Sequence, residues 1–429
     1  MTAIGIALDD RDRASLDGAH GPAMQFAMRL VLAAAEILGA RSLVSVTFAH
    51  IDACFYSGEA HVDFAQYVLA HGARLAIPAW TNNGVVSLAD PDIRPEASDP
   101  QTVMGARKLM QLYERLGCKP VWTCAPYQLP GGPRYGDHIV AGESNAVSFY
   151  NSVIGARTNK YGDYLDVACA LIGKAPYAGL HLDEERRGDI LIRTDAIPDD
   201  WKNDNIFYHL LGHYAGQFSG RRIPVISGLP PQKTMDSLKA LSAAAATSGG
   251  VAMWHAQGIT PEAKTLDHAF QGGAPGAILE LTSALLAKAR QDLTSAADGP
   301  LDMVALGTPH FSLTEFERLM PFIDGRRLKP GLAFYISTSR HVRHEAATRG
   351  WLGDLEKFGA TVIADTCTYY SPAVRRCRGH IMTNSAKWAY YAPGMLGVEV
   401  SFGSLAECVE SAVRGEVWRD PRLWTNGLP

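Results

Sequence analysis

The sequence predicts an α/β protein with several α/β layers and mostly parallel sheets. Short apolar runs alternate along the chain with longer segments of helical periodicity, and strands that alternate with helices favour parallel pairing. The chain has 429 residues, of which 47% are hydrophobic and 20% charged. This is enough sequence for two or three domains, each with its own core.

The first half of the chain begins with alternating helices and strands. The predicted order is a helix at 21–40, a strand at 42–50, a helix near 62–71, a strand at 73–80, a helix near 100–117 and a strand at 119–127. The stretch "GESNAVSFYNSVIGARTNKYGD", residues 142–163, then predicts a mostly buried helix. Its polar stripe holds small neutral groups, Ser144, Ser148, Asn151 and Gly155, where a surface helix would carry Lys and Glu.

The last third of the chain repeats the alternating pattern. Strands are predicted at 301–310, 331–340 and 359–367, with helices at 312–325 and 339–359. The segment 260–300 is rich in Ala, Gly and Asp and marks a plausible boundary. The predicted organisation is an N-terminal α/β region at 1–265, a connecting segment at 266–300 and a C-terminal α/β domain at 301–429.

Charge and hydropathy exclude some classes of function. The net charge of −4 leaves no excess of Lys and Arg for nucleic-acid phosphates. The longest apolar stretch, residues 28–40, contains Arg29 and Glu36 and is too short to span a bilayer. The N-terminus carries charges directly after a very short apolar start and does not resemble a signal peptide. We therefore expect a cytoplasmic protein that binds neither nucleic acid nor membrane.

The cysteines do not form a disulfide framework, because they are odd in number, scattered and without a CxxC pair. They are Cys54, Cys118, Cys124, Cys169, Cys367, Cys377 and Cys408.

Three predicted strands end in residues that could carry chemistry. The stretch "WTCAPY" contains Cys124, "LGTPHFS" contains Thr308 and His310, and "ADTC" contains Cys367. Ligands of open α/β sheets gather outside the carboxyl ends of strands. Each thiol taken alone is better explained as a small buried hydrophobe. Together the thiols could bind a metal, or one of them could be a nucleophile with a histidine in hydrogen-bond reach.

A second polar cluster surrounds the buried helix. Asp137 and His138 precede it, and Arg157, Thr158 and Asn159 follow it in "GARTN". A buried polar group without a hydrogen bond costs about 1–3 kcal/mol, so the stripe serves either helix packing or a polar pocket. In a pocket, Arg157 would hold a carboxylate with two hydrogen bonds.

Two further segments allow both a structural and a functional interpretation. "LHLDEERRGDI" (180–190) contains His181, and it predicts either a pocket wall or a solvated charge run. "HIMTNSAKWAYYAPG" (380–394) contains Asn384, Ser385 and Lys387 in one short turn. Ser and Asn there could cap a helix, or the turn could bind an anion.

Taken together, these segments resemble the large, catalytic subunit of the aconitase X family. "GDHIVAGESNAVSFYNSVIGARTNKYGD", "GPAMQFAMRLV", "WTCAPY", "GLHLDEERRG", "AMWHAQGITPEA", "LGTPHFSLTE", "ADTC" and "MTNSAKWAYYAPG" follow the family's order over nearly the whole chain. The resemblance implies an aconitase-like arrangement of α/β domains that lacks the swivelling domain. It also implies a hydro-lyase that removes water from a β-hydroxy acid, with iron held by cysteines. A separate small swivelling subunit would supply a catalytic serine.

The resemblance places three metal-ligand positions on Cys124, Thr308 and Cys367. Many family members have Gly-Cys-Pro-His where this chain has "GTPH", and a hydroxyl is a far poorer ligand for an iron–sulfur cluster than a thiolate. Mononuclear iron, or a small iron–sulfur cluster with an oxygen ligand, therefore suits this chain better than a four-iron cluster.

The resemblance implies that the bacterial hydroxyproline enzymes of the family also tend to lack the full cysteine set. It therefore favours the dehydration of cis-3-hydroxy-L-proline to Δ1-pyrroline-2-carboxylate. The alternative substrate is mevalonate 5-phosphate, for which the glycine-containing stretch 246–258 could supply a phosphate-binding turn. A catalytically inactive partner or regulatory subunit, and a metal-free enzyme that uses Cys367 as a thiol, are alternatives from other classes.

Within the dehydratase hypothesis each polar residue takes a role. His310 would protonate the departing hydroxyl, Asp137 and His138 would handle protons, and Lys387 would line the pocket wall. The predicted substrate-binding residues are Ser144, Ser148, Asn151, Arg157, Thr158, Asn159, His181, Asn384 and Ser385.

Overall fold

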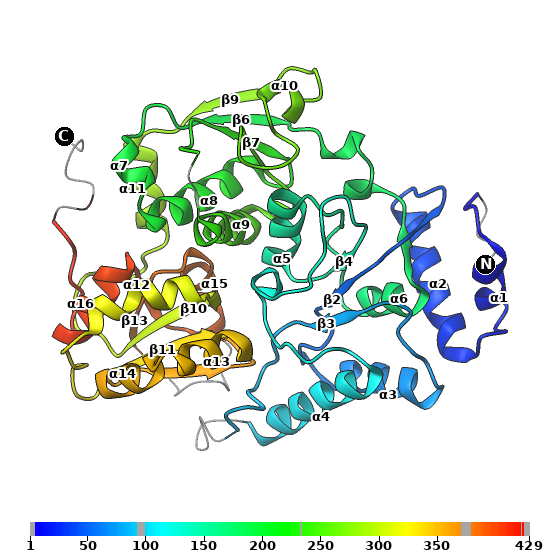
Figure 1. The fold of residues 1–429 in the computed structure, drawn as a ribbon, viewed down its shortest axis with the longest axis horizontal. Helices are drawn as coiled ribbons and strands as arrows, with labels where there is room; N and C mark the ends of the chain where they lie inside the picture. Colours follow the sequence, from blue (N-terminus) through cyan, green and yellow to red (C-terminus); the bar gives the residue numbers. More distant parts are fainter. Residues whose placement is uncertain (1–4, 92–98, 232–233, 370–378, 422, 424–429) are drawn as a thin grey trace. The chain divides into compact units, whose positions relative to one another are not determined.

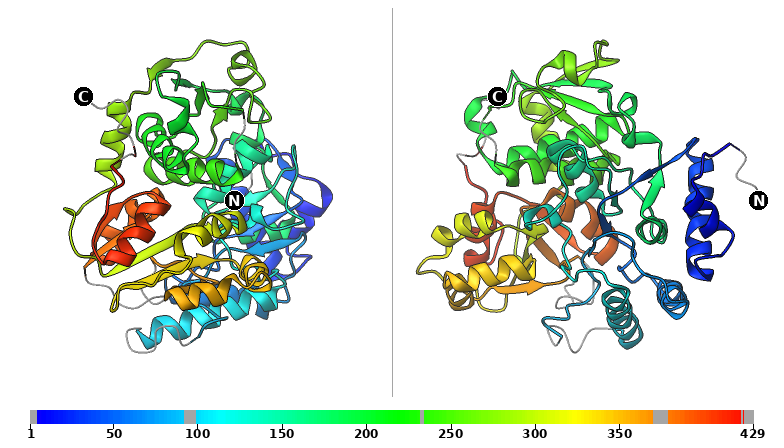
Figure 2. Two further views of the ribbon diagram at one scale, coloured as in Figure 1. Left: turned by 60° about the vertical axis from the view of Figure 1, so that its left-hand side comes forward. Right: turned by 45° about the vertical axis from the view of Figure 1, so that its right-hand side comes forward.

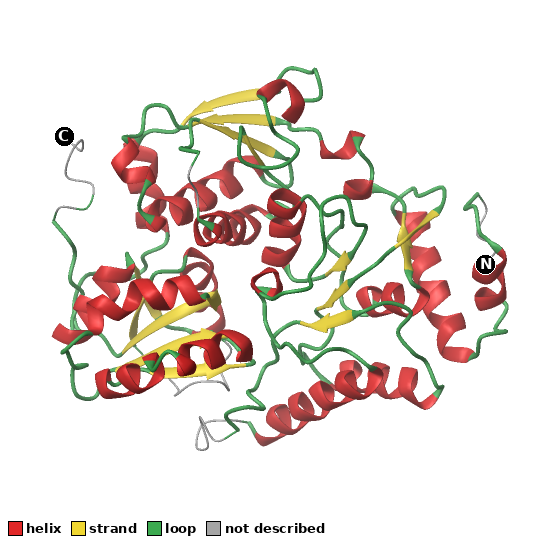
Figure 3. Ribbon diagram, in the orientation of Figure 1, coloured by secondary structure: helices red, strands yellow, loops and turns green. Residues whose placement is uncertain are grey.

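The computed structural model describes residues 5–91, 99–231, 234–369, 379–421 and 423. Residue contacts divide the chain into two compact units, which are treated separately below. Unit 1 comprises residues 1–84 and 99–187, and unit 2 comprises residues 85–98 and 188–429. Both units mix helices with mostly parallel sheets (Figures 1 and 3), which confirms the predicted α/β class. The predicted boundaries at residues 265 and 300 stay a prediction.

Unit 1 is built on a small parallel sheet with strand order β3-β2-β4. An additional antiparallel pair joins β1 to β5. Its strands are β1 Leu43–Ser45, β2 Ala49–Ile51, β3 Ala79–Thr81, β4 Val140–Ala141 and β5 Lys174–Pro176. Its helices and helical turns are α1 Asp10–Leu16, α2 Pro22–Ile37, α3 Glu59–Ala70, α4 Pro100–Leu116, η1 Pro126–Gln128, α5 Ser144–Phe149, η2 Tyr150–Ile154, α6 Leu165–Ile172, η3 Gly179–His181 and η4 Glu184–Arg186.

The helices predicted near 21–40, 62–71 and 100–117 are confirmed as α2, α3 and α4. The single strand predicted at 42–50 is two short strands, β1 and β2, in different sheets, and the strand predicted at 73–80 is shorter and begins later, as β3.

The strand predicted at 119–127 is wrong. Lys119 makes a single bridge to Trp80, and the chain then becomes irregular before the short turn η1. Pro120 lacks the N–H that would continue the ladder, and Trp122 adopts a positive φ of +44°. The resulting loop, rather than a strand, carries Cys124.

The helix predicted within residues 142–163 is also much shorter than expected. An α-helical segment, α5, runs only over Ser144–Phe149, and a single π-helical turn follows at Tyr150–Ile154. The helix then ends at Gly155. A π-helical turn inside or beside an α-helix is rare and is frequent at functional sites.

Unit 2 contains two parallel sheets. A four-stranded sheet has the order β8-β7-β6-β9, and a five-stranded sheet has the order β12-β11-β10-β13-β14. The elements around the first are β6 Ile190–Arg193, α7 Asp199–Lys202, α8 Asn205–Ser219, β7 Pro224–Ser227, α9 Met235–Gly249, β8 His255–Ala256, α10 Leu266–Ala269, β9 Ala277–Glu280 and α11 Ser283–Asp292. Those of the second are β10 Met303–Phe311, α12 Leu313–Ile323, β11 Ala333–Thr338, α13 Arg340–Thr348, α14 Trp351–Phe358, β12 Thr361–Ala364, β13 His380–Thr383, α15 Ala386–Leu396, β14 Glu399–Phe402 and α16 Leu405–Arg414.

The three strands predicted in the last third of the chain are confirmed as β10, β11 and β12. The helix predicted at 339–359 is two helices, α13 and α14, because Gly350 adopts a left-handed φ of +79° between them. A continuous apolar core, which includes Phe311, Phe316 and Phe334, packs these helices against the five-stranded sheet. Figure 2 shows this sheet and its helices from two further sides. None of the described helices combines the length and the apolar character that crossing a membrane requires.

Candidate functional site

In unit 2, His310 and the loop after β12 meet at the carboxyl ends of two parallel strands. His310 is completely buried, and Cys367 is almost so. The Nε2 atom of His310 lies 3.0 Å from the carbonyl oxygen of Thr366. A carbonyl oxygen only accepts, so Nε2 carries the hydrogen, and Nδ1 is the nitrogen whose lone pair is available to a metal when the ring is neutral. A histidine that ligates a metal is typically oriented in this way by its other nitrogen.

The position of His310 depends on an irregular end of β10. The pairing of β10 with β11 is regular up to Leu306 and shifts in register before Phe311. Gly307 lies within this shift with a φ of +89°, and a Cβ atom there would come within 2.1 Å of the Ser337 carbonyl oxygen. Only glycine fits so close to the neighbouring strand. The shift carries Thr308 and His310 to the end of the sheet.

In unit 1, side chains from three segments fix the loop that carries Cys124. Asn145 of α5 donates its Nδ2 hydrogen to the Cys124 carbonyl oxygen at 2.7 Å. His50 of β2 donates from Nε2 to the Thr123 carbonyl oxygen at 2.9 Å. The Trp122 amide donates to the Thr81 hydroxyl at 3.0 Å. The buried helix α5 therefore supports the cysteine loop through Asn145, a residue that the sequence did not single out.

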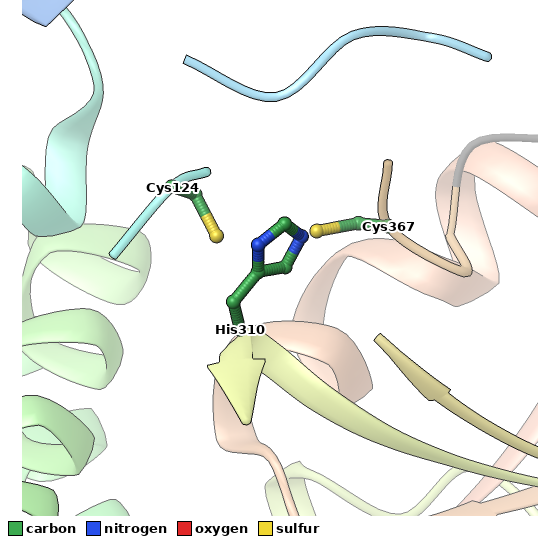
Figure 4. Close-up of side chains that lie close together, drawn as sticks. All are labelled: Cys124, His310 and Cys367. Carbon is green, nitrogen blue, oxygen red and sulfur yellow. The ribbon is translucent and has the colours of Figure 1, made fainter. Parts of the chain in front are cut away.

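Cys124, His310 and Cys367 each offer one ligand atom, and these atoms lie within 4.8 Å of one another (Figure 4). All three residues are buried. Two sulfurs and one imidazole nitrogen are soft and borderline donors that suit iron, zinc or copper. The two cysteines were predicted as ligands from sequence, whereas His310 was predicted as a proton donor. Its chemistry allows it to be the third ligand.

Thr308 occupies the third ligand position that the family resemblance predicted. Its side chain is buried, and its hydroxyl has no hydrogen-bond partner among the described residues. Its carbonyl oxygen accepts a hydrogen bond from the Ser385 hydroxyl. The role of Thr308 as a ligand stays a prediction.

The "GARTN" segment forms a buried network around Asn151. Asn151 donates to the Thr158 carbonyl oxygen at 2.8 Å and accepts from the Thr158 amide at 3.0 Å. Arg186 is 1% exposed and donates to Asn151, Ala156 and Leu180. Asn151, a member of the predicted polar stripe, therefore forms its hydrogen bonds within the protein. This agrees with the interpretation of the stripe as a helix-packing surface. Arg186 was overlooked because "DEERRGD" resembles a solvated charge run.

His138 and His181 form a hydrogen-bonded chain that ends at Tyr161. The two Nδ1 atoms are 2.9 Å apart, and the Tyr161 hydroxyl lies 2.7 Å from His181 Nε2. Burial, reinforced by the charges of His138, Arg186 and Arg157, lowers the pKa of His181 to about 3. Burial and the Arg157 charge also lower the pKa of His138. Both rings are therefore neutral at pH 7, since burial disfavours the charged form of each.

Other predicted site residues have local partners. Arg157 pairs with the exposed Asp183 and donates to the His181 carbonyl oxygen. Asn159 bridges the backbone of Ala178 and Leu180. The Asp137 carboxylate accepts from the Arg134 amide at 2.8 Å.

Four further predicted residues lie in or at the start of helices α15 and α5. Ser385 caps α15 by accepting from the Trp388 amide, while Lys387 is buried in the first turn of that helix. Ser144 is the first residue of α5. Ser148, one turn later, is buried, and its hydroxyl has no hydrogen-bond partner within the described ranges.

Asn384 is partly buried. Cys377 lies outside the described residues.

The stability of the Cys124 loop should depend on pH through His50. Burial lowers the pKa of His50 to about 4, whereas an unfolded histidine titrates near 6.5. The unfolded chain therefore binds the extra proton between these values, and stability falls as the pH drops below about 6.5. His50→Gln keeps a donor for the Thr123 carbonyl oxygen without a titratable ring. We expect the free energy of unfolding, measured in urea at pH 7.5 and 5.0, to fall less on acidification in this variant than in the natural chain. The difference should be up to about 1.4 kcal/mol per pH unit. An unchanged difference between the two pH values would contradict this role of His50.

Comparison with known proteins assigns the chain to a family. Three family models match in succession: aconitase X first domain at residues 5–184, second domain at 188–291 and third domain at 301–414. A cis-3-hydroxy-L-proline dehydratase of Pseudomonas aeruginosa is 44% identical over 417 residues, which are 96% of this chain and 71% of that protein. The enzyme of the same name from Hypocrea jecorina is 39% identical over 96% of this chain and 69% of that protein.

More distant relatives extend the comparison. A phosphomevalonate dehydratase large subunit of Methanothermobacter thermautotrophicus is 30% identical over 94% of this chain and 98% of that protein. The solved structure of Thermococcus kodakaraensis aconitase X, in its holo-form, superimposes with a TM-score of 0.83 at 28% identity and covers 95% of this chain and 100% of that chain. The relatives named here by their activity are dehydratases. The chain belongs to the aconitase X family, as its motifs indicated.

Proposed function

We propose that this chain is the large subunit of an iron-dependent hydro-lyase that dehydrates cis-3-hydroxy-L-proline to Δ1-pyrroline-2-carboxylate. The observation that carries the proposal is the grouping of Cys124, His310 and Cys367 in a chain of the aconitase X family. The two relatives at 44% and 39% identity are named for this substrate, whereas the phosphomevalonate relative is 30% identical.

The donor set supports a metal at this place. Three ligands leave coordination positions open for substrate oxygens, as catalytic metal sites require. His310 is oriented toward a ligand role by its bond to Thr366. A bound iron would act there as a Lewis acid toward the hydroxyl and carboxylate of the substrate. Cys124, His310 and Cys367 are the proposed ligands, with Thr308 as a candidate for a further contact.

The residues of the chain would orient the substrate and handle its protons. Dehydration removes the hydrogen next to the carboxylate and the hydroxyl on the neighbouring carbon, so a base and an acid are required. The neutral chain of His138, His181 and Tyr161 is suited to proton transfer, with Asp137 next to it in sequence. The Ser148 hydroxyl, which is buried without a hydrogen-bond partner in the described part of the chain, supports a role in ligand binding. Ser144, Arg157, Asn384 and Lys387 are further proposed contacts.

Three of the predicted substrate contacts would act indirectly. Asn151, Thr158 and Asn159 use their side chains in hydrogen bonds to the backbone and, for Asn151, also to Arg186. We infer that they shape the pocket rather than contact the substrate. Ser385, which caps α15 and bonds Thr308, would likewise hold the Thr308 segment in place.

We infer that a small partner subunit completes the enzyme. The phosphomevalonate relative is named a large subunit, and this chain matches 98% of its length. The partner would supply a serine as the base that removes the substrate proton.

An activity assay tests the proposed function. The chain is purified without oxygen, together with its small partner, and is supplied with cis-3-hydroxy-L-proline or mevalonate 5-phosphate. We expect turnover of the hydroxyproline, loss of turnover after treatment with a chelator, and recovery on addition of Fe²⁺. Turnover of mevalonate 5-phosphate alone would reassign the substrate. Turnover that is indifferent to the chelator would favour a metal-free thiol enzyme, and a complex that binds iron without turnover would favour a regulatory subunit.

A further inference from the structure

The loop that carries Cys367 is held by a fully bonded carboxylate two residues earlier. Asp365 is completely buried, and its two oxygens accept four hydrogen bonds. Arg340, at the start of α13, donates from Nε and Nη2 at 2.6 and 2.7 Å. The amides of Leu88 and Ala89 donate at 3.0 and 2.9 Å. The carboxylate therefore joins a helix start, a distant segment and the loop in one place.

The backbone at Asp365 is held in an uncommon conformation. Its φ is +71°, a region that a non-glycine residue adopts at a cost and that persists only where the surroundings enforce it. The four hydrogen bonds provide that enforcement. A left-handed residue at this point turns the chain out of β12 and directs Thr366 and Cys367 toward His310.

A second set of contacts holds the same loop from the same segment. The Thr366 hydroxyl donates to the Val85 carbonyl oxygen at 3.2 Å. The Asp90 carboxylate pairs with Arg343 of α13 at 2.6 Å and accepts weakly from the Ala364 amide at 3.4 Å. Residues 85–90 thus lie across the loop and bind it on both sides of Asp365. The Thr366 carbonyl oxygen remains directed at His310.

We propose that Asp365 and Arg340 are a positioning pair that fixes the Cys367 sulfur and the His310 ring as metal ligands. This inference rests on the proposed function. Bidentate Arg–carboxylate pairs combine strength with a fixed geometry, and outer groups that orient metal ligands are commonly worth ten- to a hundredfold in metal affinity. Arg340 is 41% exposed on its side chain, while Asp365 is wholly buried. Loss of the Arg340 side chain opens no cavity in the core, but it leaves the buried Asp365 carboxylate with only its two amide donors and should therefore loosen the loop.

Three substitutions test the pair. Asp365→Asn keeps the size of the side chain, and asparagine tolerates the positive φ. Its amide N–H hydrogens, however, must face a donor that now bonds to the carboxylate. Arg340→Gln removes the positive charge, and Arg340→Lys keeps it without the two-pronged geometry. Glu410→Gln is the matched control. Glu410, on helix α16 beside the five-stranded sheet of unit 2, is also a carboxylate that pairs with arginines, Arg326 and Arg414. Thermal unfolding of each variant shows whether it is folded.

The first measurement is a titration of the metal-free complex with Co²⁺, followed by the sulfur-to-cobalt charge-transfer absorption. We expect Asp365→Asn and Arg340→Gln to weaken Co²⁺ binding about ten- to a hundredfold and to change the charge-transfer band. Arg340→Lys should be intermediate, and Glu410→Gln should match the natural chain. Unchanged affinity and spectrum in folded Asp365→Asn and Arg340→Gln would overturn the proposal.

The second measurement requires no metal. The metal-free complex is treated with iodoacetamide, and the alkylation rate of Cys367 is followed by mass spectrometry of its peptide. We expect a severalfold faster rate in Arg340→Gln than in Glu410→Gln, because a released loop exposes the thiol. Equal rates would contradict the positioning role. If the natural chain bound no Co²⁺ at all, the metal hypothesis would fail, while the alkylation rates would still decide whether the pair holds the loop.

Discussion

Cys367→Ala is expected to abolish metal binding and dehydration together. A thiolate is the strongest donor in the proposed set, and one histidine with one cysteine is a poor site for iron. Loss of an outer group that orients a ligand typically costs ten- to a hundredfold, so loss of the ligand itself should exceed about a hundredfold in both metal affinity and turnover. Metal content by mass spectrometry and the hydroxyproline assay measure the two effects on the same preparation.

Cys408→Ala is the matched control for this prediction. Cys408 is equally buried, but it lies in the apolar core between α16 and the five-stranded sheet. Burial, followed by the charge of Glu407, raises the pKa of its thiol far above the usual range, so it remains an uncharged core residue. The control should lose stability of about 1 kcal/mol and keep its metal. Normal iron content and turnover in folded Cys367→Ala would remove the metal hypothesis.

The sequence was sufficient where local pattern decides the structure. The helices predicted at 21–40, from its apolar periodicity, and near 100–117 correspond to α2 and α4. The strands that end near His310 and Cys367 were recognised because each is an apolar run that stops at polar residues. The parallel sheet then brings these ends together, so the two residues could be predicted as neighbours.

The sequence was insufficient where long-range contacts decide the role of a residue. Asn145 was not singled out from the sequence, yet it donates to the Cys124 carbonyl oxygen. Arg186 looked like part of a surface charge run, yet it is buried at the centre of the "GARTN" network. Asp365 was not singled out from the sequence, and its partners Leu88 and Ala89 lie far away along the chain. No local pattern reports such partners.

Lys239→Met should cause a large loss of stability, because Lys239 is the cation of a buried network in unit 2. Its ammonium group pairs with Glu315 of α12, lies 3.6 Å from Asp236 and donates to the His310 carbonyl oxygen at 3.3 Å. Removing one partner of a buried ion pair typically lowers the free energy of unfolding by about 3–5 kcal/mol, and we expect a loss of that size here. Urea unfolding at pH 7.5 measures this loss. Lys288→Met, which removes the exposed partner of Asp292 on α11, should cost less than about 1 kcal/mol.

The loss in Lys239→Met should shrink in acid, and the direction follows from Glu315. Burial raises the pKa of Glu315 to about 6 even while the Lys239 charge opposes that rise. Without Lys239 the folded-state pKa rises further. The folded variant then binds a proton that the unfolded chain has released, so its stability increases as the pH falls from 7.5 toward 5.5. Glu315→Gln combined with Lys239→Met should recover part of the loss at pH 7.5 and remove this pH dependence. If Lys239→Met lowered the free energy of unfolding as little as Lys288→Met, the buried network would contribute little to stability. The His310 carbonyl oxygen would then be positioned by strand β10 alone.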